Sequence, residues 1–164
     1  MEDDIPDYNK KEFLVLGCGN ILFGDDGLGP ETVEYFKKNY PIPSNTEVIN
    51  AGCSVRNILF DISLSDKKPK KIIIIDACDK GKKPGKIFSV DIEDVPEKKI
   101  DNFSMHQIPT SNLLKELRDL KKINIKIISC QPELIPDSVS SGLSKKVAKA
   151  VPEICNLIMR ELKE

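Results

Sequence analysis

Apolar residues occur along this chain in short blocks, and the spacing within each block is typical of either a strand or a helix. Two blocks are nearly continuous, FLVL at 13–16 and KIIIIDA at 71–77. An uninterrupted apolar run of this length is typical of a strand covered on both faces in a parallel sheet. We therefore predict two buried strands and place 71–77 at the centre of the sheet.

Weaker patterns predict three further strands at 46–51, 86–92 and 123–130, the second of them at an edge. Between the strands, apolar residues recur with the spacing of an amphipathic helix. The residues predicted to face inward in four helices are Val33, Phe36 and Tyr40; Val55, Ile58, Leu59 and Ile62; Leu113, Leu114, Leu117 and Leu120; and Val147, Val151, Ile154, Ile158 and Leu162. Pro152 should kink or break the last helix.

This alternation of strands and helices predicts an α/β fold. We expect a single three-layer domain over residues 12–164, with a mostly parallel twisted sheet of about five strands and helices on both faces. Residues 1–11, MEDDIPDYNKK, are polar and acidic, and are predicted to form a flexible tail. A chain of 164 residues is long enough for one domain with its own core.

The segment 12–30, EFLVLGCGNILFGDDGLGP, organises the rest of the chain. It predicts a strand, a glycine loop, two adjacent acids and a helix with Pro30 at its first position, where the missing N–H has no cost. Gly17 and Gly19 allow a sharp turn and the close approach of a neighbour. In open α/β sheets such a loop lies at the carboxyl ends of the strands, where ligands bind.

Two other interpretations of this loop compete with a catalytic one. A dinucleotide-binding loop needs a third glycine and an acid about 20 residues further on. Here the third position is Leu22, and the strand at 46–51 ends without a carboxylate, so no nucleotide is expected. Alternatively, Asp25 and Asp26 only cap the following helix, which explains one acid better than two.

Composition narrows the possible partners and the compartment. The formal net charge of −1 gives no overall attraction to nucleic acid or membrane, and no apolar run approaches the roughly 20 residues of a membrane span. The acidic N-terminus does not read as a signal peptide, so we expect a cytoplasmic protein. Its five cysteines include no C-x-x-C pair, which argues against a zinc module or a disulfide framework.

Three residues are candidates for chemistry at the strand ends. Asp26 follows the first strand, Asp76 ends the third, and the single histidine, His106, lies in the loop after the fourth. Neighbouring strands are about 5 Å apart, so carboxylates at their ends can converge. Two carboxylates and an imidazole suit a borderline divalent ion such as nickel or zinc. A capping role for Asp76 and a solvent-exposed His106 remain open alternatives.

Longer motifs resemble those of the hydrogenase maturation endopeptidases. The matching strings are GCGNILFGDDGLG, the strand IIIIDACDKG, the histidine segment SMHQIPTSNLL and the late loop QPELIPDSVSSGLS, in the order and spacing of the family. The resemblance implies that Asp26, Asp76 and His106 are catalytic and contact a metal. It assigns a supporting role to Gly17, Gly19, Asn20, Asp25 and Gly27. The chain departs from many relatives at Asp26, where they carry glutamate, and at Cys130, where they often carry glycine.

The resemblance also implies a reaction and a partner. Such an enzyme removes the C-terminal extension of a nickel–iron hydrogenase large-subunit precursor after nickel insertion. It recognises the nickel already bound in this substrate, and other divalent ions such as cadmium or zinc can occupy the same site. The ion would polarise the scissile carbonyl or activate a water, or an aspartate would act as general base. Family members of this size are expected to be monomers. Lysine-rich composition and a divergent N-terminal tail favour the branch of the deazaflavin-coenzyme-reducing hydrogenase of methanogenic archaea.

Two questions stay open at the level of sequence. A non-cleaving nickel or hydrogenase assembly adaptor would use the same three residues, and only activity separates it from a protease. Four cysteines end or follow predicted strands: Cys18, Cys53, Cys78 and Cys130. Small thiols pack well at such positions, whereas Cys18 and Cys78 could instead be soft ligands near the nickel.

Overall fold

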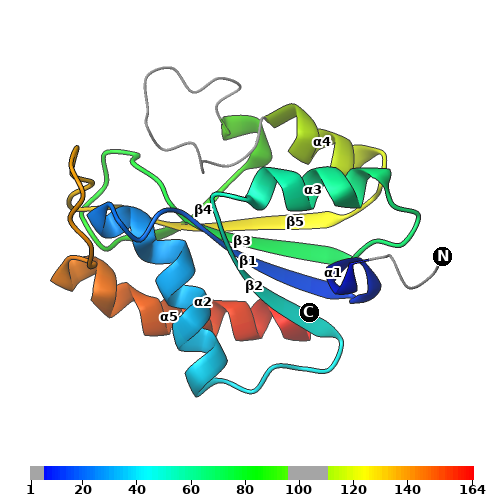
Figure 1. The fold of residues 1–164 in the computed structure, drawn as a ribbon, viewed down its shortest axis with the longest axis horizontal. Coiled ribbons are helices and arrows are strands. Elements are labelled where there is room, and N and C mark those ends of the chain that lie inside the picture. The colour runs from blue at the N-terminus through cyan, green and yellow to red at the C-terminus, as the bar shows by residue number, and fades with distance from the viewer. Residues whose placement is uncertain (1–5, 96–110) are drawn as a thin grey trace.

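The computed structural model of the protein describes residues 6–95 and 111–164, and its strands form one five-stranded sheet (Figure 1). The strands are β1 (Phe13–Cys18), β2 (Thr46–Gly52), β3 (Lys71–Ala77), β4 (Ile87–Val90) and β5 (Asn124–Cys130). Their order is β2-β1-β3-β5-β4, with β3 at the centre. All neighbours run parallel except the edge strand β4, which is antiparallel to β5.

Helices cover both faces of this sheet, which confirms the predicted three-layer α/β fold (Figure 1). The helices α2 (Leu28–Asn39) and α5 (Lys145–Lys163) pack on one face. The helices α3 (Val55–Leu64) and α4 (Ser111–Asp119) pack on the other. Within the described residues, no helix is long and apolar enough to cross a bilayer.

The isoleucine run of β3 fills both cores at once. Successive side chains of a strand point to opposite faces, so Ile73 and Ile75 enter the core beneath α2 and α5. Ile72 and Ile74 enter the core beneath α3 and α4. All four are fully buried, and full burial of an aliphatic side chain contributes about 1.5–3 kcal/mol. This strand therefore anchors the sheet and holds its own carboxyl end in place.

Several element boundaries differ from those predicted. A short 3-10 helix, η2 (Gly24–Gly27), leads straight into α2, so the helix begins at Leu28 and Pro30 is its third residue. Pro30 is tolerated there because the first four N–H groups of a helix have no partner within it. The edge strand β4 is shorter than 86–92, because Ile92 begins a second 3-10 helix, η3 (Ile92–Asp94).

Two details of the helices also correct the prediction, and a third refines it. Leu120 follows the last residue of α4 and is 75% exposed, so it does not belong to the buried face. Tyr40 lies just after α2, but it packs against the core as predicted and stacks its ring on Phe36, with 5.1 Å between centroids. The helix α5 continues through Pro152 without a break, and its predicted apolar face is buried as expected.

Part of the segment predicted as a tail is ordered against the domain. Residues Asp7–Lys10 form the short helix α1, in which Asn9 is buried. The hydroxyl of Tyr8 donates a hydrogen bond to the carboxylate of Asp61 in α3, at 2.7 Å.

Candidate functional site

The carboxyl ends of β1 and β3 bring two buried acids to the same edge of the sheet. Asp76 is the penultimate residue of β3 and is 3% exposed. Asp26 lies in η2, which follows β1 and contacts β3, and is 4% exposed. Gly17 pairs with Ile75 in the parallel ladder between the two strands, so the loop carrying Asp26 starts beside Asp76.

Close backbone packing fixes where this loop turns into α2. A Cβ atom at Gly29 would lie 2.2 Å from the carbonyl oxygen of Cys18 and 2.5 Å from that of Ile75. A Cβ at Gly17 would lie 2.3 Å from the carbonyl oxygen of Gly29. The first turn of α2 therefore rests directly on the ends of β1 and β3. These glycines are used for contacts within the chain, where a dinucleotide-binding loop would use them to approach a ligand.

Gly19 and Asn20 position Asp26 itself. Gly19 has φ +134, and a Cβ there would lie 1.9 Å from the carbonyl oxygen of Asp26. The amide of Asn20 donates to the carboxylate of Asp26 and to its carbonyl oxygen, both at 3.1 Å. The loop thus closes on Asp26 through main-chain bonds, and Gly27, which ends η2, packs against Ile21.

Asp25 points away from this pair and anchors the late loop, residues 131–144. Its carboxylate accepts hydrogen bonds from the amides of Glu133 (2.8 Å), Leu134 (3.0 Å) and Ser144 (2.7 Å), and from the hydroxyl of Ser144 (2.9 Å). Asp25 is fully buried. A carboxylate is an acceptor only, so a ring of four donors suits it. The two adjacent aspartates therefore have different surroundings.

Further main-chain hydrogen bonds join the first loop, residues 19–27 between β1 and α2, to the late loop. Phe23 forms a parallel bridge with Ser140. The amide of Gly24 donates to the carbonyl of Ser140 at 2.8 Å, and the amide of Ser140 donates to the carbonyl of Leu22 at 2.8 Å. The two loops form one rigid unit at the carboxyl edge of the sheet.

Gln131 anchors the loop between β3 and β4, as Asp25 anchors the late loop. Its side chain is buried, and its carbonyl oxygen accepts from the amides of Lys80 (2.8 Å) and Lys82 (3.1 Å). Its amide nitrogen donates to the carboxylate of Asp79 at 2.9 Å, and this bond lowers the pKa of Asp79. Sequence analysis did not single out Gln131 or Ser144. A polar residue directly after a buried strand is the signal that could have indicated Gln131.

The four cysteines at strand ends do not share one environment. Cys18 and Cys130 are buried, Cys78 is half-buried and Cys53 is exposed. Burial raises the pKa of Cys18 well above its usual value, and the nearby Asp76 and Cys53 add to this effect. Partial desolvation also raises the pKa of Cys53, with a second contribution from the charge of Asp26. Cys18 therefore lies near Asp76 and Cys53, and Cys53 lies near Asp26.

His106 and the loop around it lie outside the described residues. Within 6–95 and 111–164, no group of three or more His, Cys, Asp or Glu side chains has the arrangement of a metal site. The described part of the predicted site thus consists of Asp26 and Asp76 with their supporting loops. The departure at Cys130 leaves the strand intact, because β5 continues through this residue and its carbonyl accepts from the amide of Cys78 at 3.2 Å.

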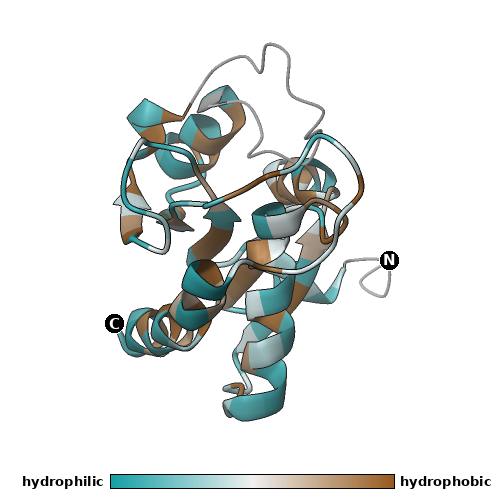
Figure 2. Cartoon of the chain, turned by 90° about the vertical axis from the view of Figure 1, so that its left-hand side faces the viewer, coloured by the Kyte–Doolittle hydropathy of each residue, from teal (hydrophilic) through white to brown (hydrophobic). Residues whose placement is uncertain are grey.

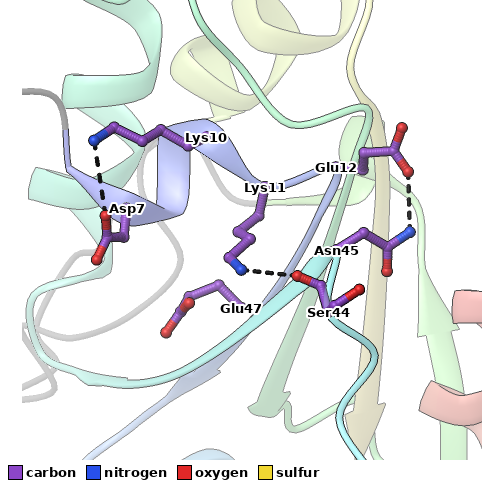
Figure 3. A pocket seen from close by; sticks show the side chains of 7 residues that line it. All are labelled: Asp7, Lys10, Lys11, Glu12, Ser44, Asn45 and Glu47. Atoms are coloured by element: carbon purple, nitrogen blue, oxygen red, sulfur yellow. Dashed lines mark hydrogen bonds and ion pairs between the residues drawn. The ribbon is translucent and has the colours of Figure 1, made fainter. Parts of the chain in front are cut away.

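A pocket of about 480 Å³ lies at the amino ends of the strands, where β1 and β2 begin (Figure 3). Its polar side chains largely bond to their surroundings. Lys11 donates to the carbonyl of Ser44 at 2.8 Å, and Asn45 donates to Glu12 at 2.9 Å. This pocket contains none of the predicted site residues.

Comparison with known proteins shows the family of this chain. The sequence model of the hydrogenase maturation protease family, HycI, matches residues 30–161. A Methanocaldococcus jannaschii protein whose name assigns it to the hydrogenase maturation proteases is 41% identical over 156 residues, covering 94% of this chain and 99% of that protein. The chain therefore belongs to the hydrogenase maturation proteases, as its motifs predicted, and it is a peptide-bond hydrolase.

Two further comparisons refine this assignment. The delta subunit of coenzyme F420 hydrogenase from Methanothermobacter thermautotrophicus is 38% identical over 156 residues, covering 92% of this chain and 94% of that subunit. This similarity agrees with the branch predicted from the sequence. The hydrogenase maturating endopeptidase HybD of Escherichia coli superposes with a TM-score of 0.74 at 26% identity, covering 93% and 92% of the two chains.

Proposed function

We propose that this protease removes the C-terminal extension of a nickel–iron hydrogenase large-subunit precursor after nickel insertion, and that Asp26, Asp76 and His106 contact the nickel bound in that substrate. One observation carries the proposal within the described residues. Two buried carboxylates, one in η2 after β1 and one at the end of β3, stand at the carboxyl ends of the strands, where α/β proteins bind ligands.

The chemistry of this pair favours a cationic ligand. Both carboxylates are buried, and buried charges in proteins are paired or coordinate metals. Carboxylate oxygens with one imidazole match a borderline divalent ion. Nickel arriving with the precursor would supply the positive charge, and a metal ion beside a scissile carbonyl acts as a Lewis acid. The supporting loops fix the positions of Asp26 and Asp76 in advance, because their backbone contacts leave little freedom at Gly19 and Gly29.

A cysteine nucleophile is a poorer explanation of the hydrolysis. A reactive cysteine needs a lowered pKa, because the thiolate is the attacking species. The exposed thiol near the site, Cys53, has a raised pKa through partial desolvation and the charge of Asp26. The same applies more strongly to Cys18. We therefore assign the hydrolysis to the carboxylates and the histidine.

The relative from Methanothermobacter thermautotrophicus suggests the substrate branch. That protein is named as a subunit of coenzyme F420 hydrogenase. We propose the large-subunit precursor of a deazaflavin-coenzyme-reducing hydrogenase as the substrate of this protease.

Mass spectrometry of a nickel-loaded precursor incubated with the protein tests this proposal. The expected result is one C-terminally shortened product from the nickel-loaded precursor and none from the nickel-free precursor. Asp76→Asn and His106→Ala should each reduce cleavage by about a hundredfold or more, whereas Asp66→Asn, an exposed acid in the loop after α3, should not change it. Equal cleavage with and without nickel would contradict recognition of the metal, and binding without cleavage would indicate an assembly adaptor.

A further inference from the structure

The carboxyl edge of the sheet carries an unusual amount of exposed apolar surface. Half of the ten large apolar side chains that are exposed in the described residues lie on the first loop and the late loop. We call this set the apolar rim; its members are Ile21, Leu22, Leu134, Ile135 and Val139. Leu134 is 64% and Val139 68% exposed. Monomeric proteins seldom gather such residues in one place without a binding function.

The apolar rim is held in a fixed arrangement. Two hydrogen bonds to Asp25 hold Leu134 in place. The amide of Leu134 donates to the carboxylate of Asp25 at 3.0 Å, and the carbonyl of Leu134 accepts from the amide of Asp25 at 3.1 Å. Ser140, next to Val139, is bonded to Leu22 and Gly24. A surface ordered before binding loses less conformational entropy when a partner docks. Figure 2 looks onto this end of the molecule and shows apolar stretches in its loops.

A basic surface borders the same late loop. The β3–β4 loop contains Lys80, Lys82, Lys83 and Lys86, all exposed, and no carboxylate of the described residues forms an ion pair with them. Its only acid, Asp79, is bonded to Gln131 and Gly81. The chain as a whole has a net charge of −1, so this concentration of positive charge is local.

Contacts connect the basic surface to the late loop and to the start of α5. A Cβ at Gly85 would lie 2.8 Å from the carbonyl oxygen of Lys146. The first turn of α5 carries Lys145 and Lys146, where positive charge opposes the helix dipole at a cost of about 0.3–1 kcal/mol. Lys146 is paired with Glu133 at 3.7 Å. The positive charge of this edge therefore includes lysines that helix stability disfavours.

We infer that the apolar rim and the basic surface together bind an extended peptide segment that carries both apolar and acidic side chains. The inference rests on the proposed function, under which this segment is the C-terminal part of the precursor. Charge complementarity selects an acidic partner and sets its rate of encounter, and the apolar rim supplies the area that becomes buried. Asp26 lies in the same loop as Ile21 and Leu22, so a peptide bound here passes beside the carboxylate pair.

Fluorescence anisotropy with a labelled synthetic peptide of alternating leucine and glutamate tests the inference on the intact protein. We expect binding that weakens as salt shortens the range of the charges. Lys82→Glu/Lys83→Glu should weaken it about tenfold or more. The matched control is Lys67→Glu/Lys68→Glu, because this lysine pair also precedes a proline. The control pair lies before β3, at the amino ends of the strands, whereas Lys82 and Lys83 follow β3. This control should change the affinity by less than about twofold.

Other outcomes would overturn the inference. A peptide with lysine in place of glutamate that binds equally well would remove the role of charge, and serine in place of leucine with no loss would remove the role of the apolar rim. A dimer that dissociates in Leu134→Ser/Val139→Ser but not in Leu64→Ser would show that a second copy covers the rim. If Lys82→Glu/Lys83→Glu still cleaves the precursor at the wild-type rate, the inference fails while the protease function stands. Peptide binding without precursor cleavage by the wild type would instead refute the proposed function alone.

Discussion

The carboxylate of Asp25 accepts hydrogen bonds from both the amide and the hydroxyl of Ser144, at 2.7 and 2.9 Å, although the two residues are 119 positions apart. Ser144 is also the N-cap of α5, and its hydroxyl accepts from the amide of Val147 at 3.4 Å. This contact ties the first loop, the late loop and α5 together. The contact thereby fixes the position of the neighbouring Asp26 beside β3.

Replacing Asp25 should therefore destabilise the protein. In Asp25→Asn, the new NH₂ group faces buried donors and cannot accept their hydrogen bonds. We expect a loss of about 2–4 kcal/mol in the free energy of unfolding, measured by urea denaturation. Asp137→Asn, at an exposed position of the late loop, is the control and should change this value by less than about 0.5 kcal/mol. Equal stability of the two variants would contradict the anchoring role of Asp25.

The contact between α2 and the strand ends predicts a strong steric effect at Gly29. Helix propensity alone would favour Gly29→Ala by about 1 kcal/mol. The added Cβ would collide with backbone atoms of Cys18 and Ile75, so we expect a destabilisation of about 3 kcal/mol instead. Gly81→Ala is the comparison, since it has φ +67 but open space around it, and should cost about 1 kcal/mol. Thermal unfolding of both variants distinguishes crowding from backbone strain, and a stabilised Gly29→Ala would refute the packing described.

The coupling between Cys53 and Asp26 can be read from thiol chemistry. The charge of Asp26 contributes to the raised pKa of Cys53, so Asp26→Asn should lower that pKa and increase the thiolate fraction. With a disulfide reagent near pH 8, the reaction rate of Cys53 should rise about two- to fivefold. Asp61→Asn, on α3, is a control that should leave the rate unchanged. An unaltered rate in Asp26→Asn would mean that the two side chains are further apart than the structure places them.

A buried thiol should also make the protein sensitive to alkali. Burial raises the pKa of Cys155 from 9.0 to about 12. Between these values the unfolded chain has lost the proton that the folded chain keeps, so the free energy of unfolding falls as the pH rises from 9 to 12. Cys155 should contribute a slope of about 1 kcal/mol per pH unit in this range. Cys155→Ala should flatten the dependence measured by denaturation, and an unchanged slope would refute the assignment.

The sequence allowed prediction of features that depend on local pattern. The four isoleucines of 71–77 require cover on both faces, and β3 has the predicted bounds. The apolar face of α5 is likewise buried as its spacing predicts. Helix α2 begins two residues before the predicted start, because the pattern of 24–27 does not distinguish a loop from the 3-10 helix that leads into α2. Pro152 does not break α5 as predicted, because the buried apolar face of this long helix stabilises it on both sides of the proline.

Relations between distant residues were beyond local pattern. The sequence pointed to Asp26 and Asp76 as strand-end acids. It gave no sign that Asp25 accepts four hydrogen bonds from the late loop, because these donors are more than 100 residues away. The exposed apolar residues of the first and late loops read as ordinary loop residues until the bridge between Phe23 and Ser140 brings them together. The assignment of His106 rests on its motif, as this residue lies outside the described part.

X-ray absorption at the nickel edge tests most directly whether Asp26 and Asp76 reach the metal of the substrate. The nickel-loaded precursor would be measured alone, and then with an equimolar amount of Asp26→Ala/Asp76→Ala protein or of wild-type protein trapped before turnover. We predict additional oxygen or nitrogen neighbours around nickel with the wild type, and fewer with the double variant, which retains only His106 of the three proposed contacts. An unchanged nickel environment in a wild-type complex that goes on to cleave the precursor would contradict the proposed recognition of nickel.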